Sequence, residues 1–191
     1  MEQREERREE YAFVLDFMPT GKSFSNRAEP IAQLIGEEWF TLLEANPKPN
    51  VALTIGERVY IGKEEREKIS LIKTRIAYNE LTQTAKNGLN NVVSEMVAKN
   101  EAKFIEFFNK AGPLNIREHS LELLPGIGKK HLESILKARN EKPFANFSDL
   151  SARVPLLQSP AKLISERILS ELMGNERFYM FTKPYTRRPR Y

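Results

Sequence analysis

Leu123-Leu124-Pro125-Gly126-Ile127-Gly128-Lys129-Lys130 is the stretch on which the fold of the C-terminal half depends. An apolar run precedes it, and Pro125 is expected to end the helix that carries this run. Gly126 and Gly128 permit a tight reversal with positive backbone dihedrals. Beyond Gly128 the side chains follow a helical period of three and four, at Leu132, Ile135, Leu136 and Arg139. The local prediction is therefore a helix, a hairpin and a second helix.

The predicted hairpin has the properties of an anion-binding turn. Backbone N–H groups point outward at a helix N-terminus, where the helix dipole favours a negative charge. Two lysines lie in the first turn of the predicted helix, where cations oppose the dipole, which suggests that they serve a negatively charged partner. A bare turn between two helices is the alternative. The candidate nucleic-acid-binding residues are Gly126, Ile127, Gly128, Lys129 and Lys130.

A degraded copy of this region follows along the chain. Its markers are Ser148-Asp149 as an N-cap, Val154-Pro155 as the counterpart of Leu124-Pro125, and Ser159-Pro160 as the start of a last helix that Gly174 ends. Leu156 and Gln158 stand where the first copy has its two glycines. The second copy is therefore expected to complete a four-helix core rather than to bind phosphate.

Residues 176–191 form a basic aromatic tail. Aromatic and cationic side chains interleave there, and Glu176 is its only acidic residue. Residues 178–181 are expected to dock as a strand or an anchor. The end of the tail has too few apolar side chains to fold alone, and it suits phosphate binding and base stacking. Its candidate binding residues are Arg187, Arg188 and Arg190.

The N-terminal part reads as a small β domain. After a charged leader over residues 1–10, which is expected to be disordered, short β-rich segments alternate with glycine and proline breaks. The predicted strands cover Tyr11–Met18, Ile31–Gly36 and residues 39–45, 58–61 and 69–76. A helix over residues 36–44 competes with the second and third strands. Five short strands fit an OB-like β-barrel, with another small β-barrel as the alternative.

The face of this β domain offers candidate stacking residues, namely Phe17, Trp39 and Tyr60, although each is more typical of a core. From Leu81 the apolar period becomes helical, with Thr82 as a cap, and a second helix ends at Gly112-Pro113. The predicted fold class is α+β. Its parts are the leader over 1–10, an OB-like β domain over 11–80, connecting helices over 81–112, a tandem helix-hairpin-helix domain over 113–175 and the tail over 176–191.

Composition limits the functional classes. The chain has 191 residues and a net charge of +4, and its lack of cysteine excludes disulfides, thiolate metal sites and thiol catalysis. Residues 1–111 carry 16 Lys and Arg against 18 Asp and Glu, a net charge of −2, whereas residues 112–191 carry 14 against 8, a net charge of +6. This asymmetry favours a nucleic-acid partner. No secretory signal or membrane-length apolar run occurs, so the chain is predicted to be cytoplasmic, without a membrane partner.

Several segments together resemble an archaeal family of unknown function. They are residues 11–16, residues 56–62, residues 121–130 and Pro143-Phe144, and the resemblance covers nearly all of residues 11–181. Members of the family are described as predicted RNA-binding proteins with an OB-like N-terminal domain and a tandem helix-hairpin-helix domain. The resemblance implies this architecture and a nucleic-acid ligand, and it implies no catalytic activity.

We therefore expect a non-catalytic nucleic-acid-binding protein, with RNA preferred over DNA, that is linked to translation or ribosome biogenesis. No cofactor, metal ligand or catalytic residue is predicted, and the two histidines, His119 and His131, are expected at the surface or packed against the hairpin. A DNA repair or recombination protein or enzyme is one alternative, since Asp149 lies 21 residues beyond Gly128, near the position of a glycosylase aspartate. A protein–protein adaptor that uses the aromatic tail is another.

Overall fold

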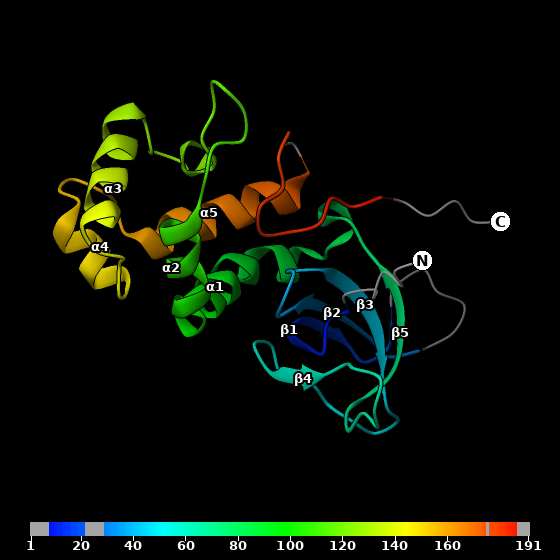
Figure 1. Ribbon diagram of the computed structural model, residues 1–191. Coiled ribbons are helices and arrows are strands. Elements are labelled where there is room, and N and C mark those ends of the chain that lie inside the picture. The colour runs from blue at the N-terminus through cyan, green and yellow to red at the C-terminus, as the bar shows by residue number, and fades with distance from the viewer. Residues whose placement is uncertain (1–7, 22–28, 175, 187–191) are drawn as a thin grey trace, which may run out of the picture. The chain divides into compact units, whose positions relative to one another are not determined.

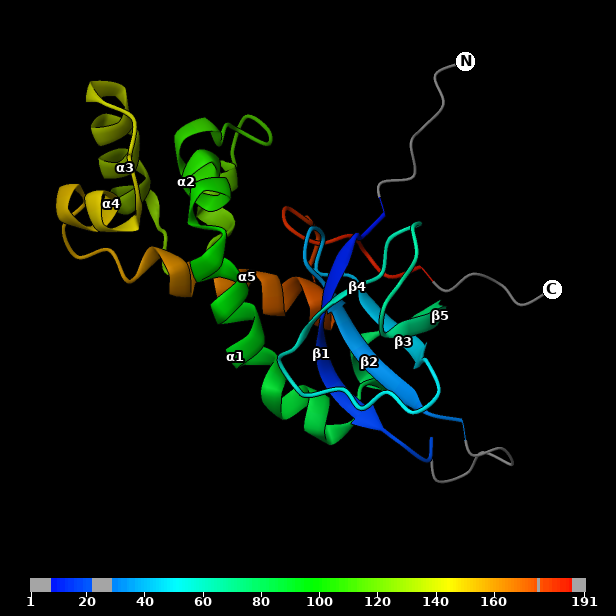
Figure 2. The same cartoon turned by 90° about the horizontal axis from the view of Figure 1, so that it is seen from below.

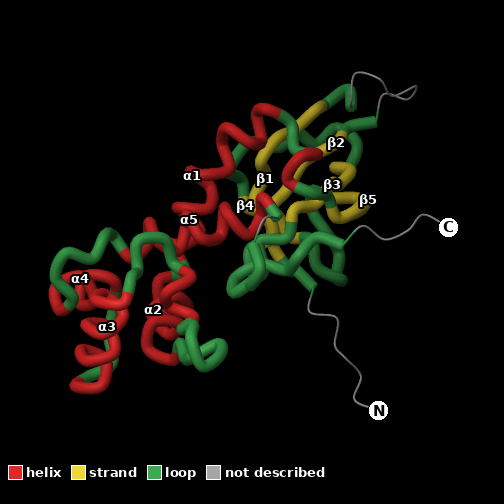
Figure 3. Tube along the Cα trace, turned by 90° about the horizontal axis from the view of Figure 1, so that it is seen from above, coloured by secondary structure: helices red, strands yellow, loops and turns green. Residues whose placement is uncertain are grey.

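The computed structural model describes residues 8–21, 29–174 and 176–186. It confirms a mixed α+β fold, and the described residues form five strands, five α-helices and two short 3-10 helices (Figure 1). The chain divides into two compact units. The first, here called the β unit, comprises Met1–Val92 and Glu171–Tyr191, and the second, here called the helical unit, comprises Val93–Ser170. All the strands lie in the β unit (Figure 3).

A curled, antiparallel half-barrel forms the β unit. Its strands are β1 (Tyr11–Met18), β2 (Ile31–Gly36), β3 (Leu42–Pro47), β4 (Arg58–Tyr60) and β5 (Ile69–Arg75). The strand order is β4-β1-β2-β3-β5, and every pairing is antiparallel. The order 4-1-2-3 is that of a Greek key, to which β5 adds a fifth strand beside β3. The competing helix over residues 36–44 is wrong, because Phe40 takes a left-handed φ of 53° in the turn before β3.

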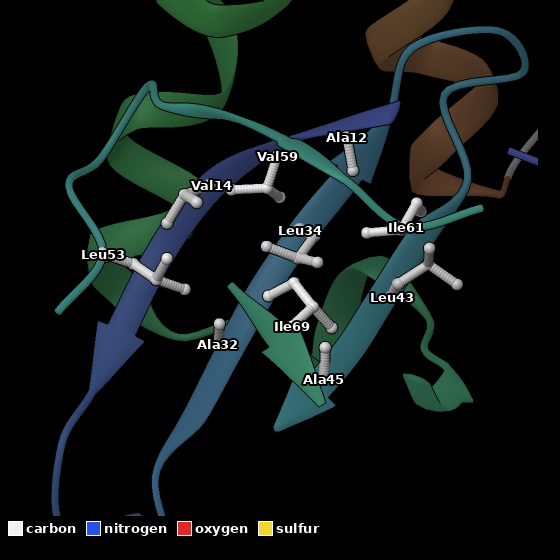
Figure 4. Packing of buried hydrophobic residues seen from close by; sticks show 10 residues of the cluster. All are labelled: Ala12, Val14, Ala32, Leu34, Leu43, Ala45, Leu53, Val59, Ile61 and Ile69. Atoms are coloured by element: carbon white, nitrogen blue, oxygen red, sulfur yellow. The ribbon is translucent and has the colours of Figure 1, made fainter. Parts of the chain in front are cut away.

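One face of the sheet carries a compact core. Ten buried residues make up this cluster, from Ala12 and Val14 on β1 to Ile69 on β5 (Figure 4). The register of β1 against β2 shifts between Val14 and Asp16. Beyond this bulge Phe17 packs against the same core as Val14. Strict alternation along β1 would place Phe17 on the face opposite Val14, and the bulge reverses this. Phe17 is partly buried and packs against the core rather than forming a stacking platform.

The other face of the sheet is also covered. All six residues of β2 are buried, including Gln33, whose amide donates to the Glu80 carbonyl and accepts from the Thr82 N–H. The 3-10 helix η1 (Tyr78–Glu80) leads into α1 (Gln83–Lys99), and the Thr82 hydroxyl accepts from the Ala85 N–H at 3.1 Å. Thr82 is thus the predicted cap. Its hydroxyl also donates to Asp16, which ties the start of α1 to β1.

A single carboxylate organises the turn between β2 and β3. Glu9 is buried, and its oxygens accept from the N–H groups of Glu38, Trp39 and Thr41 at 2.8, 3.0 and 3.1 Å. A Cβ on Gly36 would lie only 2.1 Å from the Glu9 carboxyl carbon, so the site requires glycine. The sequence placed Glu9 in a disordered leader, whereas the described end of that leader is part of the β unit.

The helical unit is built around buried Phe, Leu, Ile and Val side chains. Its helices are α2 (Glu101–Lys110), α3 (Lys129–Glu141) and α4 (Phe147–Arg153), with the last residues of α1 and, up to Ser170, α5 (Pro160–Met173). A 3-10 helix, η2 (Ser120–Leu123), stands before Pro125 where a full helix was expected. Figure 2 shows α3 and α4 side by side. Leu121, Ile135 and Leu150 are among the fully buried residues of this core.

Three arginine side chains cap the C-terminal ends of helices inside this unit. Arg139 donates to the carbonyls of Phe108, in the last turn of α2, and of Ala111, just after that helix, at 3.0 and 2.8 Å. Arg153 donates to the Ala138 and Lys142 carbonyls at the end of α3, and Arg167 donates to the Leu123 carbonyl at the end of η2. These side chains satisfy carbonyls that lack helical partners. Part of the positive charge counted in the C-terminal half is therefore structural.

Candidate nucleic-acid interface

The first turn, residues 124–128, is a rigid reversal with two buried anchors. Leu124 and Ile127 are buried, and the Ile127 N–H donates to the Leu124 carbonyl at 3.1 Å. Gly126, at the third position of this four-residue turn, has a φ of 82°. Proline second and glycine third is the pattern that a type II turn requires. Pro125 and Gly126 are left exposed between the two anchors.

Gly128 has a different role from the one predicted. Its φ of −92° and ψ of −178° are extended, so it does not use the positive dihedral that only glycine adopts readily. It serves instead as the N-cap of α3, and its carbonyl accepts from the Leu132 N–H at 2.9 Å. No atom lies within 4 Å of a Cβ built on Gly128, so glycine here leaves the surface open.

The start of α3 presents donors and positive charge together. Within the described residues, no acceptor receives the N–H groups of Gly128, Lys129 and Lys130. Both lysines are exposed, and the first turn of α3 contains no acidic residue. Bare N–H groups at a helix N-terminus with adjacent ammonium groups are suited to a phosphate. The structure therefore brings four of the five predicted residues, Gly126, Gly128, Lys129 and Lys130, to one exposed surface. The side chain of the fifth, Ile127, is buried beneath it.

The two histidines support the first turn. His131 Nδ1 lies 3.1 Å from the Gly126 carbonyl oxygen. His119 caps η2, with its Nδ1 accepting from the Leu121 N–H and its own N–H donating to Glu122. Burial, and then the charge of Arg139, lower the pKa of His119 below its ordinary value. His131 thus packs against the hairpin, as predicted, whereas His119 caps the 3-10 helix that precedes it.

The second turn, residues 154–159, repeats this backbone without glycine. Val154 is buried like Leu124, and the Leu157 N–H donates to the Val154 carbonyl at 3.4 Å. Leu156 takes a left-handed φ of 64°, close to that of Gly126 at the matching position, and its side chain is 93% exposed. The predicted repeat therefore extends to the conformation of the turn, which loss of the glycines did not suggest.

The helices beside the second turn are capped differently from the sequence prediction. Asn146, rather than Ser148, is the N-cap of α4, and its side chain accepts from the Asp149 N–H at 2.8 Å. Asp149 accepts from the Ala145 N–H and pairs with Arg153 at 3.1 Å. The Ala145 N–H is the largest cause that lowers the pKa of Asp149, ahead of Arg153. These contacts account for Asp149 as a structural residue.

The described part of the tail belongs to the β unit. Glu171 accepts from the N–H groups of Met180, Phe181 and Thr182 at 2.8, 3.1 and 2.9 Å, and Phe181 is buried. The predicted anchor over residues 178–181 is thus confirmed. The predicted binding residues Arg187, Arg188 and Arg190 lie outside the described residues.

The other two stacking candidates already have neighbours. Tyr60 meets Tyr11 edge to face, with 5.2 Å between ring centroids, and Trp39 lies 4.8 Å from the Lys183 ammonium. Both rings are half-buried. Among the described residues, no cluster of three or more His, Asp or Glu side chains could hold a metal ion. No helix of the described chain is long and apolar enough to cross a membrane.

Comparison with known proteins places this architecture in a recognised group. The family model described as "Protein of unknown function (DUF655)" matches residues 8–183. An uncharacterized protein, MJ0038 of Methanocaldococcus jannaschii, is 44% identical over 177 residues, which cover 92% of this chain and 80% of that protein. The crystal structure of Af1531 from Archaeoglobus fulgidus, assigned to the same family model, superposes with a TM-score of 0.85 at 41% identity. This match covers 92% of this chain and 100% of that one.

Proposed function

The chain belongs to the DUF655 family, whose function is unknown, and from this premise we propose that it is a non-catalytic nucleic-acid-binding protein. The first turn and the start of α3 contact the phosphate backbone of the ligand. In this proposal residues 113–175 form a tandem helix-hairpin-helix domain, and the half-barrel is an OB-like domain. The preference for RNA, and a role in translation or ribosome biogenesis, rest on the family resemblance of the sequence.

The observation that carries the proposal is the open N-terminus of α3. Lys129 and Lys130 are both exposed beside the N–H groups of the first turn, and no carboxylate occupies that turn of the helix. Such an arrangement costs the helix stability and gains nothing inside the chain, whereas a phosphate would neutralise it. This chemistry is independent of base identity, so it supports backbone binding without sequence readout.

In this proposal the second turn is a scaffold for the first turn and does not bind phosphate itself. Its helix α5 begins with Pro160, which is buried, and its nearest lysine, Lys162, lies 3.7 Å from the Glu166 carboxylate. The exposed Leu156 side chain stands where the first turn has only the hydrogen of Gly126. A phosphate therefore meets less charge and more bulk at the second turn.

The test compares two lysine variants. Binding of a fluorescent 20-base-pair RNA duplex, and of the matching DNA duplex, is measured by anisotropy at several salt concentrations. Lys129→Ala with Lys130→Ala should weaken binding and reduce the salt slope by about one to two units. The control Lys162→Ala removes a lysine from the other turn and should leave the slope unchanged.

The same variants separate binding from folding. The double variant should keep its free energy of unfolding, or gain a few tenths of a kcal/mol, since cations in the first helical turn oppose the dipole. Equal affinity and equal salt dependence for the double variant and the wild type would make the first turn a scaffold. The choice between RNA and DNA is decided by crosslinking in cells followed by sequencing of the attached nucleic acid. Enrichment of genomic DNA would favour the repair alternative.

A further inference from the structure

The β unit contains a cavity whose lining combines aromatic, charged and amide side chains. It has a volume of about 270 Å3, and all of its lining residues belong to the β unit. It lies where the end of β5 and η1 meet the end of α5 and the described tail. Six of its lining residues carry aromatic, cationic or amide groups, namely Arg75, Tyr78, Asn79, Tyr179, Lys183 and Tyr185.

Arg75 is a cationic group of this cavity that forms no ion pair among the described residues. It is half-buried, and burial is the largest cause that lowers its pKa, while an arginine side chain still stays charged in proteins. It donates to the Lys183 carbonyl, and its guanidinium carbon lies 6.0 Å from the centre of the Tyr185 ring. No carboxylate of the described chain lies within ion-pair distance of Arg75. The Glu9 carboxylate acts on Arg75 through its charge, but its oxygens accept from the backbone N–H groups of residues 38–41. A partly desolvated guanidinium that no carboxylate contacts is a site for an external anion.

Arg58, in the same unit, is an arginine that does have a carboxylate partner. Its guanidinium lies 3.5 Å from the centre of the Tyr11 ring and forms a two-pronged pair with Glu37, at 2.7 and 3.0 Å. Arg58 and Arg75 thus share an aromatic neighbour, and they differ in the carboxylate. Of these two arginines, Arg75 is therefore the one whose guanidinium can bind an external anion.

Glu171 is the acidic residue that lines the cavity, and its charge is already engaged. Its side chain is buried, and both carboxylate oxygens accept backbone N–H groups of the tail. It therefore holds residues 180–182 in place against the end of α5. Its charge opposes an incoming anion less than an open carboxylate would.

We propose that this cavity binds a single nucleotide, with its phosphate on Arg75 and its base stacked on the tyrosines that line the wall. Arginine pairs with phosphate through parallel N–H bonds, and tyrosine rings stack on any base. The volume lies just below the range of roughly 300–1,000 Å3 that is usual for ligand pockets, which suits a nucleotide better than a larger ligand.

This inference rests on the proposed function, because a nucleic-acid-binding protein meets such nucleotides as the ends of single strands. A free nucleotide has the same chemistry. The probes are therefore adenosine 5′-monophosphate, an eight-residue oligoadenylate and inorganic phosphate, each titrated into the full chain by calorimetry.

Arg75→Gln should weaken binding of the nucleotide probes at least about tenfold, since a hydrogen bond to a charged group is lost. Tyr185→Leu should weaken it about fivefold or more through lost stacking. The matched control Arg58→Gln should bind like the wild type. Melting temperatures are compared for all three, and Tyr185→Leu, at the rim, keeps the test decisive if Arg75→Gln does not fold.

The probes assign the source of the nucleotide. Binding of the monophosphate means a free nucleotide fits, whereas binding of the oligoadenylate alone means that the nucleotide must be part of a strand. Equal binding of inorganic phosphate would overturn the nucleotide assignment, and so would equal affinities for the wild type and both cavity variants. The Lys129→Ala and Lys130→Ala variant should bind the monophosphate normally, so failure here and failure of the first turn are distinguishable.

Discussion

The first and second turns share a backbone and differ in what they expose. Both have a buried residue at the first position, a left-handed residue at the third and an i to i+3 hydrogen bond. The first leaves bare N–H groups and two lysines at its surface, while the second displays the side chain of Leu156. The comparison teaches that glycine is not needed to form this turn. Glycine at the third position instead removes backbone strain and leaves the backbone N–H groups exposed.

The strain at Leu156 has an identifiable source. A left-handed residue with a side chain costs about 1–2 kcal/mol relative to the right-handed region. Such conformations persist where the surrounding structure fixes them, and here Val154 and Pro160 on either side are buried. Gly126 meets the same demand without this cost. Three sets of variants test this difference between the two turns.

The largest effect on stability is expected from truncating the buried side chain at the first position of each turn. Leu124→Ala should lower the free energy of unfolding of the helical unit by about 2–5 kcal/mol, and Val154→Ala by about 1–3 kcal/mol, since both side chains are fully buried. Urea titration measures both values. Ile116→Ala is the control, because that side chain is fully exposed and should change stability by less than about 0.5 kcal/mol. A Val154→Ala variant as stable as the control would show that the second turn lacks an anchor.

A smaller effect on stability is expected from substitutions at the left-handed residues, Gly126 and Leu156. Gly126→Ala should cost about 1–2 kcal/mol, although no atom would touch its Cβ, because the cost is conformational. Leu156→Gly should instead gain up to about 1 kcal/mol, as relief of strain exceeds the entropy of glycine. Gly128→Ala should stay within about 0.5 kcal/mol, since its backbone is extended. Thermal unfolding distinguishes the three, and destabilisation by Leu156→Gly would mean that the exposed leucine packs on something in solution.

The smallest effect is a local response to pH. The pKa of His119 is lowered, so the folded state favours the neutral ring, and stability that is complete above pH 6.5 is lost as the pH falls from 6.5 through the folded pKa. The pKa of Asp149 is also lowered, and its contribution is lost only as the pH falls below 3.8. Between pH 7 and 5, the Leu121 N–H beside the first turn should lose about two- to tenfold of its exchange protection. The Ala145 N–H near the second turn should keep its protection.

His119→Asn provides the control for this response. Asparagine offers an N-cap acceptor that does not titrate, so the pH dependence at Leu121 should disappear. Protection that still fell in this variant would assign the response to another group.

Most of the secondary structure could be predicted from local signals. The bounds of β1 and β2 match the predicted strands, because glycine and proline breaks enclose their apolar runs. The bulge after Val14 was not predictable, since it is a feature of the register between β1 and β2 and no residue type in β1 marks it. The cap of α4 was misplaced by two residues, because Asn146 and Ser148 are both good cap formers and only tertiary structure chooses between them.

The candidate site was predicted in part. Gly126 and the two lysines were found from their spacing, but the φ of Gly128 depends on where α3 begins. The inward arginines were missed, although Arg139 and Arg167 fall on the apolar stripes of α3 and α5. A cation within such a stripe is a signal for a capping arginine. The cavity at Arg75 could not be predicted, because its walls come from residues far apart in the sequence.

The Glu9 site bears on the order in which the β unit assembles. This carboxylate precedes β1 and accepts from N–H groups of residues 38–41, some thirty positions away, so its bonds form only after the turn that follows β2 has reached the start of β1. Contacts of such separation arise late in folding, since loop closure must come first. Glu9 thus fixes the turn after β2 against the start of β1. A nascent chain cannot complete these bonds until Thr41 has been synthesised.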